Sequence, residues 1–231
     1  MRRAVRSFSF LLFCALFLTI CRPLAAAEAK IYYKQSSSDE KKRVALTFDD
    51  GPHPRYTPEI LDILREYGIC ATFFVVGTNA EFYPSLVLRE VNEGHEIGNH
   101  TSNHFHTANL SREELEKDVR SCQETITKIT GKAPGLFRPP EGVCTKNVQN
   151  IAEKMDLTVV LWSVDTRDWA HTPPCEIVKN IRKNTRDGSI ILMHDFIGKN
   201  SPTPAALRQV LPLLLESGFE FVTVSSLIGG K

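Results

Sequence analysis

The chain alternates between short apolar runs and longer stretches in which apolar residues recur every three or four positions. The short runs are rich in β-branched and aromatic residues and end at glycine or at polar residues, a pattern that predicts buried strands. The predicted strands cover residues 43–48, 71–76, 96–98, 136–137, 158–162, 189–193 and 219–224. The alternation therefore indicates about seven strands.

The longer stretches carry helix start and stop signals. Ser111 opens a capping box with Glu114, and Thr57 stands as an N-cap before a proline. The predicted helices cover residues 57–67, 84–93, 111–130, 145–155, 175–184 and 203–217. Strands and helices that alternate at this spacing favour an α/β fold with parallel strands, either a distorted (β/α) barrel or a doubly wound sheet.

Polar side chains follow five of the predicted strands at the point where each strand ends. In both candidate folds, ligands bind at the carboxyl ends of the strands, so these clusters are expected to share one rim. An Asp-Asp pair alone is typical of a plain turn, and only the convergence of the clusters indicates a site. The clusters are Asp49-Asp50, residues 100–104, residues 138–142, residues 165–169 and His194-Asp195.

Composition adds little to this picture. The 231 residues are 42% hydrophobic and 24% charged, with a formal net charge of +1. This profile is that of an ordinary globular protein and gives no sign of a polyanionic partner, so nucleic acid is not expected as a ligand. No shift of composition divides residues 43–231, and we expect one domain there, acting as a monomer.

The first residues differ in kind from the rest. A basic start, the apolar run 8–20 and the alanines at 25–27 are typical of a secretory signal peptide. We therefore expect residues 1–27 to be a signal peptide and residues 28–42 to be a polar linker. The protein is expected to be secreted, with no stable membrane span after cleavage, and a signal-anchored form is the alternative.

Four cysteines lie in the part that we expect to be exported. They show none of the close spacing of a zinc site, and they allow three complete disulfide pairings among which sequence does not choose. We expect buried thiols or disulfides. The four are Cys70, Cys122, Cys144 and Cys175.

His100 and His104 stand four residues apart, so a helical turn or compact loop would offer both imidazoles to one ion. One carboxylate from Asp49-Asp50 would complete a set with open positions that suits Zn²⁺ or another transition ion such as Co²⁺. The other aspartate would stand beside the ion as a general base. Three further histidines, none with a histidine four residues away, are rival ligands: His53, His95 and His106.

The segment after the fourth strand offers two further groups. Arg138 lies in a stiff segment between Phe137 and two prolines, where it could hold the base ionised and oriented. Pro139 and Pro140 lack N–H groups, so the next free backbone amide is that of Glu141. This amide could donate a hydrogen bond to an oxyanion beside the metal.

His194 ends an apolar strand, where an imidazole at the closed end of a pocket could protonate a leaving amine. Either Asp165 or Asp168 could orient this ring and raise its pKa. Apolar side chains near the strand ends could form the walls of a pocket for an acyl methyl group and a sugar ring. These are Trp162, Trp169 and Leu192.

Five segments, in this order and at these separations, resemble the motifs of the NodB-homology polysaccharide deacetylases, carbohydrate esterase family four. The resemblance covers residues 43–226 and implies a distorted (β/α) barrel. The segments are Thr-Phe-Asp-Asp-Gly at 47–51, His-Thr-Ser-Asn-His at 100–104, Arg-Pro-Pro-Glu-Gly at 138–142, Asp-Thr-Arg-Asp-Trp at 165–169 and Leu-Met-His at 192–194.

The resemblance also implies metal-assisted hydrolysis of N-acetyl or O-acetyl groups on a glycan, and it implies roles by motif position. Asp49 would be the base, His194 the acid and Arg138 the residue that tunes the base. Asp168 is the preferred partner of His194, and the amide of Glu141 would hold the oxyanion. The implied metal ligands are Asp50, His100 and His104.

One position departs from the family pattern, because many members carry an aromatic residue where this chain has Glu141. The backbone role survives that change, but the side chain places a negative charge at the rim. The expected substrate is peptidoglycan N-acetylglucosamine or N-acetylmuramic acid, with chitin oligosaccharides and acetylxylan as alternatives. Two rivals are a non-catalytic secreted glycan-binding protein and a metal-dependent hydrolase of a different bond.

Overall fold

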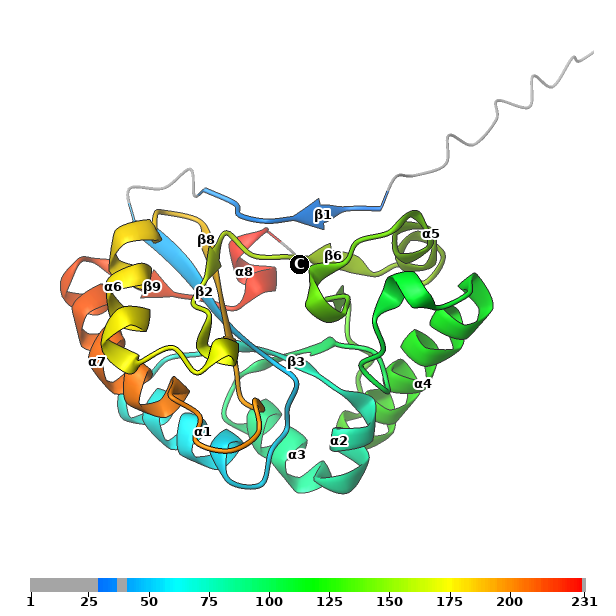
Figure 1. Cartoon of the computed structure of the whole chain (residues 1–231), viewed down its shortest axis with the longest axis horizontal. Coiled ribbons are helices and arrows are strands. Elements are labelled where there is room, and N and C mark those ends of the chain that lie inside the picture. Colours follow the sequence, from blue (N-terminus) through cyan, green and yellow to red (C-terminus); the bar gives the residue numbers. More distant parts are fainter. Residues whose placement is uncertain (1–28, 37–40, 230–231) are drawn as a thin grey trace, which may run out of the picture.

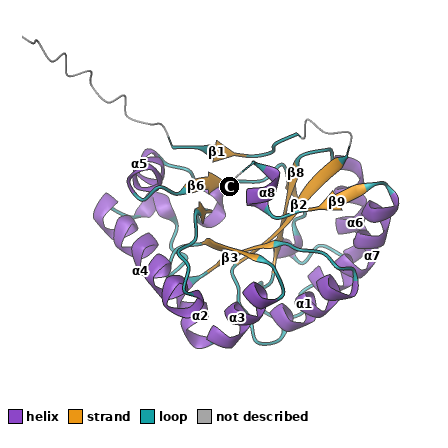
Figure 2. Cartoon of the chain, turned by 180° about the vertical axis from the view of Figure 1, so that it is seen from behind, coloured by secondary structure: helices purple, strands orange, loops and turns teal. Residues whose placement is uncertain are grey.

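A computed structural model describes residues 29–36 and 41–229 of the chain. One parallel sheet curls inside an arc of helices, and β1 crosses the side that the arc leaves open, as Figure 1 shows from one side and Figure 2 from behind. The predicted signal peptide, residues 1–27, lies outside the described residues. In the described part of the chain, no helix is both long enough and apolar enough to span a membrane.

The strands run in the order β1-β6-β5-β4-β3-β2-β8-β7, with β9 paired to β2, and every neighbouring pair is parallel. This curled sheet confirms the distorted (β/α) barrel, and the doubly wound alternative is wrong. The strands are β1 (Ile31–Tyr32), β2 (Lys42–Asp49), β3 (Thr72–Val75), β4 (Glu96–Asn99), β5 (Leu136–Phe137), β6 (Thr158–Val160), β7 (Val164–Asp165), β8 (Ser189–His194) and β9 (Phe219–Phe221).

All six predicted helices are present, and two short ones were not predicted. The chain from Val224 forms a helix and not a strand, because the Thr223 hydroxyl caps it by accepting a hydrogen bond from the Ser226 amide. The helices are α1 (Tyr56–Glu66), α2 (Gly77–Phe82), α3 (Pro84–Asn92), α4 (Arg112–Thr130), α5 (Lys146–Lys154), α6 (Pro174–Asn184), α7 (Thr203–Glu216) and α8 (Val224–Leu227).

Thr57 does not cap α1, contrary to the prediction. The N-cap is Arg55, and Thr57 lies inside the helix. Its hydroxyl accepts a hydrogen bond from the His53 amide over 2.7 Å and donates one to Asp195 over 2.5 Å. The first turn of α1 is therefore tied to the chain that follows β8.

Part of the range predicted as a polar linker is paired into the sheet. β1 lies beside β6, Lys34 forms an isolated antiparallel bridge with Ser189, and the Gln35 amide donates to Gly188 over 2.9 Å. In Figure 1 this segment crosses one end of the sheet from β6 towards β8. These are backbone pairings with distant segments, so the polar composition of residues 35–42 gave no sign of them.

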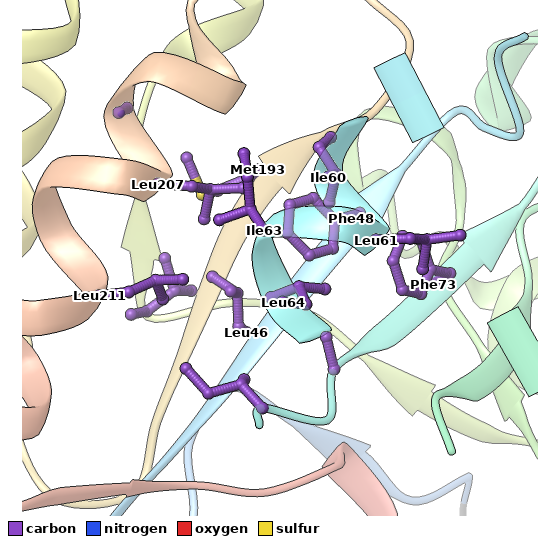
Figure 3. Packing of buried hydrophobic residues seen from close by; sticks show 14 of the residues in the cluster. Leu46, Phe48, Ile60, Leu61, Ile63, Leu64, Phe73, Met193, Leu207 and Leu211 are labelled. Atoms are coloured by element: carbon purple, nitrogen blue, oxygen red, sulfur yellow. The ribbon is translucent and has the colours of Figure 1, made fainter. Parts of the chain in front are cut away.

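The main core lies between the strands and helices α1 and α7 (Figure 3). Leu46 and Phe48 of β2 contribute fully buried side chains, and the Phe48 ring stacks on Phe73 with 4.9 Å between ring centroids. Apolar residues from both faces of β2 are buried, as expected for a central parallel strand. This packing fixes the carboxyl end of β2, where the predicted site begins.

The four described cysteines are all free thiols, so no disulfide forms among them. Cys122 of α4 is buried, and this burial raises the pKa of its thiol to about 12. Of the two options left open by the sequence, the thiols are the ones present in the structure.

Glu90 of α3 is a fully buried carboxyl group, and neither of its oxygens has a hydrogen-bond partner among the described residues. Burial raises its pKa well above the usual value of 4.5, and the charge of Asp195 raises it further. The folded state thus holds this proton to a higher pH than the unfolded chain does. Stability must therefore fall as pH rises above about 4.5 towards the raised pKa.

We expect Glu90→Gln to flatten this part of the stability profile, because the amide does not ionise. Urea unfolding at pH 5 and pH 8 should show the wild type losing more free energy of unfolding over this interval than the variant. Glu153→Gln, at an exposed position of α5, is the matched control and should behave like the wild type. Equal pH dependence in the wild type and Glu90→Gln would contradict the assignment.

Candidate active site

The two adjacent aspartates after β2 have different surroundings. Asp49 is 3% exposed, whereas Asp50 is intermediate in exposure and has a left-handed backbone with φ 75°. Asn79 donates to the Asp50 carbonyl over 2.7 Å. Gly51 follows because any Cβ there would collide with the carboxylate of Asp195. The turn is thus fixed with its two carboxylates directed to different partners.

Asp50 lies with the two histidines of the predicted metal site. Its Oδ1 is 3.2 Å from Nε2 of His100 and 3.0 Å from Nε2 of His104, and one ligand atom from each residue lies within 4.8 Å of the others. The Nδ1–H of His100 donates to the Arg138 carbonyl over 2.7 Å, so its Nε2 faces the cluster and could bind an ion once it carries no proton. Three acceptor atoms that face one another suit a divalent cation.

The charges of this cluster are coupled. Burial would raise the pKa of Asp50, but hydrogen bonds from His100 and His104 outweigh burial and hold that pKa well below its usual value. The hydrogen bond to Asp50 in turn raises the pKa of His104, against the opposing effect of burial. The Asp50 carboxylate is thus stabilised by positive charge beside it. A bound metal ion would supply that charge in place of the protons on the two histidines.

The three rival histidines lie elsewhere. The Nδ1 of His95 accepts a hydrogen bond from the Ala71 amide over 3.1 Å, and burial lowers the pKa of His95 to about 4. His53 stacks between two aromatic rings, and Nε2 of His106 lies 3.7 Å from Glu141. Over residues 29–36 and 41–229, Asp50, His100 and His104 are the one group with ligand spacing.

Arg138 is fully buried and holds Asp49. Its Nη1 donates to Asp49 Oδ1 over 2.6 Å and to the Thr47 hydroxyl over 2.8 Å. Its Nε and Nη2 donate to the carbonyls of Val160 and Leu161 over 3.0 and 3.2 Å. A buried guanidinium is tolerable only when its donors and its charge are matched in this way. Burial lowers the pKa of Arg138, and the Asp49 charge opposes that shift.

His194 is paired with Asp168, the preferred of its two predicted partners. The Nδ1–H of His194 donates to Asp168 Oδ1 over 2.8 Å, and the His194 amide donates to Oδ2 over 2.7 Å. Burial acts to lower the pKa of His194, but the hydrogen bond and charge of Asp168 outweigh burial and raise this pKa to about 9. Asp165 instead accepts from the Arg167 amide and from Nε1 of Trp169, over 2.8 and 3.3 Å.

These groups surround a cavity of about 400 Å³ at the carboxyl ends of the strands. Asp49 and His194 both line it together with the three candidate ligands, and its apolar walls come from Trp162, Trp169 and Leu192. Asp165 and Glu141 complete the lining. The Asp49 carboxylate and the His194 imidazolium therefore both face a cavity that suits a small acyl group.

The third predicted motif forms a tight turn, from Pro140 to Gly142. Pro140 is buried and is not among the residues that line the cavity. Glu141 adopts a left-handed backbone with φ 56°, which is uncommon for a residue with a side chain. Gly142 leaves room for the ring of Trp162, which any Cβ at this position would contact too closely. The turn thus fixes Glu141 at the rim.

Sequence reasoning predicted Arg138 and Asp168 as the partners of the catalytic candidates, but it missed the contacts that support Asp168 and join the neighbouring loops. The Thr203 hydroxyl at the start of α7 donates to Asp168 Oδ2 over 2.7 Å, although 35 residues separate the two. Thr57 and Asp195 join the loops after β2 and β8. Burial raises the pKa of Asp195 to about 7. No local pattern marks Thr203, whereas His194-Asp195 could have suggested a second buried carboxyl.

Loss of Asp50 should weaken metal binding. We expect Asp50→Asn to lower the affinity for Zn²⁺ by at least about 100-fold, because even residues that only orient metal ligands contribute 10- to 100-fold. Calorimetric titration of the metal-stripped protein measures this. His106→Asn is the matched control and should bind Zn²⁺ like the wild type. An equal loss in both variants would contradict the assigned ligand set.

Comparison with known proteins agrees with this site. A family model described as polysaccharide deacetylase matches residues 36–160. A peptidoglycan-N-acetylglucosamine deacetylase of Bacillus cereus is 45% identical over 195 residues, which are 84% of this chain and 91% of the relative. A chitooligosaccharide deacetylase of Azorhizobium caulinodans is 39% identical over an alignment of 203 positions, which covers 83% of this chain and 94% of the relative.

Among solved structures, the Bc1960 peptidoglycan N-acetylglucosamine deacetylase superimposes with a TM-score of 0.83 at 37% identity. The match covers 87% of this chain and 94% of that one. The family model covers more than half of the chain and reaches from before β2 to the end of β6, so it includes the aspartate pair, the two histidines of the candidate metal site and Arg138. On these matches, the chain belongs to the polysaccharide deacetylase family.

Proposed function

We propose that this protein removes N-acetyl groups from peptidoglycan, from N-acetylglucosamine or N-acetylmuramic acid residues. The observation that carries the proposal is that Asp49 and His194 line the same cavity as the candidate metal ligands. Asp49 is bonded to Arg138, and His194 is held as an imidazolium by Asp168. An amide hydrolase needs such a pair, a base for the attacking water and an acid for the leaving amine.

Asp49 is the general base of this mechanism. Its Oδ1 accepts from Arg138 over 2.6 Å, so Oδ2 is the atom left to take a proton from the attacking water. The hydroxyl part of that water adds to the acetyl carbon. The backbone amide of Glu141 then donates a hydrogen bond to the oxygen on which negative charge develops. The buried ion pair keeps the carboxylate in one orientation throughout.

His194 is the general acid. Because Nδ1–H is donated to Asp168, the proton available for transfer is the one on Nε2. The raised pKa of about 9 keeps that proton in place at neutral pH. His194 gives it to the sugar nitrogen as the carbon–nitrogen bond breaks, which leaves acetate and a free amine. Asp168 stabilises the imidazolium until then.

The ion would be held by Asp50, His100 and His104, and we propose Zn²⁺ for this chemistry of ligands. When bound, it supplies a Lewis acid that polarises the acetyl carbonyl and makes water easier to deprotonate. Asp49 can act as the general base only if it is not itself a ligand of the ion. The pairing of Asp49 with Arg138 supports that division.

The peptidoglycan assignment rests on the Bacillus cereus relative and the Bc1960 structure, both named for that substrate. Chitin oligosaccharides are the alternative substrate, because the Azorhizobium relative is named as a chitooligosaccharide deacetylase. Intact base and acid positions weigh against a non-catalytic glycan-binding protein. We further propose that residues 1–27 direct export, that residues 43–231 form the catalytic domain, and that the enzyme acts on the cell wall as a monomer.

Asp49→Asn should lower kcat for acetate release from N-acetylated peptidoglycan by about 10²- to 10⁴-fold, because the amide cannot accept the proton of water. Zn²⁺ affinity should stay near that of the wild type, in contrast to Asp50→Asn. Asp156→Asn is the control, since Asp156 is exposed before β6 and has a left-handed backbone that asparagine tolerates. Full activity in Asp49→Asn would refute the assignment.

The pH profile should report on His194. An acid must be protonated to act, so activity falls as pH rises through its pKa, which Asp168 holds near 9. Asp168→Asn removes the charge that raises this pKa, and the alkaline limb of kcat should move down by at least about one pH unit. The measurement is kcat from pH 6 to 10 in both proteins. A limb that stays in place while kcat falls would show that Asp168 acts only on the fold.

A further inference from the structure

A second groove lies beside the active site, between the loops that follow β2 and β8. It has a volume of about 390 Å³, and its lining includes His53, Arg55, Tyr56, Phe196 and Lys199. Both loops leave the barrel at the rim that carries the active site. His53 comes three residues after Asp50, and Phe196 two residues after His194. The groove and the active-site cavity thus share their supporting loops.

The aromatic side chains that line the groove are held in place by stacking and by hydrogen bonds. The His53 ring stacks between Tyr56 and Phe196, with ring centroids 5.0 and 4.9 Å apart. The Nδ1 of His53 accepts from the amides of Arg55 and Tyr56 over 3.2 and 3.3 Å. The Tyr56 hydroxyl accepts from the Ser201 amide over 3.2 Å. These contacts join the two loops, while Phe196 remains 37% exposed.

The groove is also basic. Neither Arg55 nor Lys199 has a carboxylate within 4.0 Å in the described part of the chain, and the Arg55 guanidinium lies over the Tyr56 ring at 5.2 Å. The active-site cavity is lined by four carboxylates, those of Asp49, Asp50, Glu141 and Asp165, and two of them have partners. Asp49 pairs with Arg138, and Asp50 lies against His100 and His104. The two cations of the groove have no such partner among the described residues, so a substituent with negative charge is favoured there.

We propose that this groove binds the acidic stem peptide carried by a muramic acid residue, while the acetylated sugar occupies the active-site cavity. This inference rests on the proposed action on peptidoglycan. Peptidoglycan differs from chitin in that its alternate sugars bear peptides with free carboxylates, which Arg55 and Lys199 would pair with. The aromatic wall offers an apolar surface to the peptide backbone and its small side chains. The groove would thus select peptidoglycan over a neutral glycan.

The test compares two substrates, a peptide-bearing peptidoglycan tetrasaccharide and neutral N-acetylchitotetraose. Removing both charges in the Arg55→Gln, Lys199→Gln double variant should lower kcat/KM for the first about five-fold, as expected for two partly screened ion pairs. The value for chitotetraose should stay within about two-fold. The effect on the peptide-bearing substrate should shrink in 0.5 M salt, because exposed charges are screened.

The matched control is Arg182→Gln, Lys183→Gln, which removes the same charge from exposed positions of α6. It should leave both substrates unaffected. An equal loss on both substrates in the groove variant, or no loss on either, would overturn the proposal. Thermal unfolding of each variant shows whether the fold is kept.

A binding measurement separates this proposal from the proposed function. Calorimetric titration with the peptide-bearing tetrasaccharide should give a weaker Kd for the groove variant than for the wild type. If the wild type releases no acetate from either glycan but this difference in Kd is found, the proposed deacetylase function is wrong and the proposed peptide binding by the groove is supported. If acetate is released and neither Kd nor kcat/KM depends on the two cations, the proposed peptide binding is wrong and the deacetylase function is kept.

Discussion

The active site depends on the burial of one guanidinium group. Arg138 has no exposure to water, and among the described residues its ion-pair partner is Asp49, 2.6 Å away. Breaking such a buried pair costs roughly 3–5 kcal/mol, because the remaining charge is left uncompensated. The guanidinium is also held by carbonyls of the chain after β6 and lies over the Phe74 ring at 4.0 Å. The Asp49 side chain, at the end of β2, is therefore held in place by Arg138 and the strands around it and not by the loop that follows β2.

That constraint divides two neighbouring carboxylates between two tasks. Asp49 is bonded to Arg138 and comes only within 3.8 Å of Nε2 of His100, whereas Asp50 lies 3.2 and 3.0 Å from Nε2 of His100 and His104. The same logic operates on the other side of the cavity, where Asp168 makes His194 a stronger base than a free imidazole. The protein thus holds a carboxylate and an imidazolium in one cavity, because each has its own buried partner of opposite charge.

The surrounding loops are joined by groups that touch none of the reacting atoms. Thr57 and Asp195 connect the chain after β2 with the chain after β8, and Gly51 makes room for that contact. Thr203 plays a similar part for Asp168. The same two loops stack His53 against Phe196, which gives the rim a basic and aromatic groove in addition to the active-site cavity. The charge pattern of the rim thus extends beyond the residues of the reaction.

The sequence by itself determined an α/β fold with parallel strands and the polar clusters that gather at one rim, because strand periodicity and strand-end clusters are local patterns. The patterns alone left a barrel and a doubly wound sheet open, and the strand order decided for the barrel. Only the tertiary structure decided which aspartate pairs with Arg138 and that Asp168, not Asp165, holds His194. It also decided the place of β1, because sheet pairing with β6 joins segments more than a hundred residues apart. Such choices depend on distances between elements, which no local pattern records.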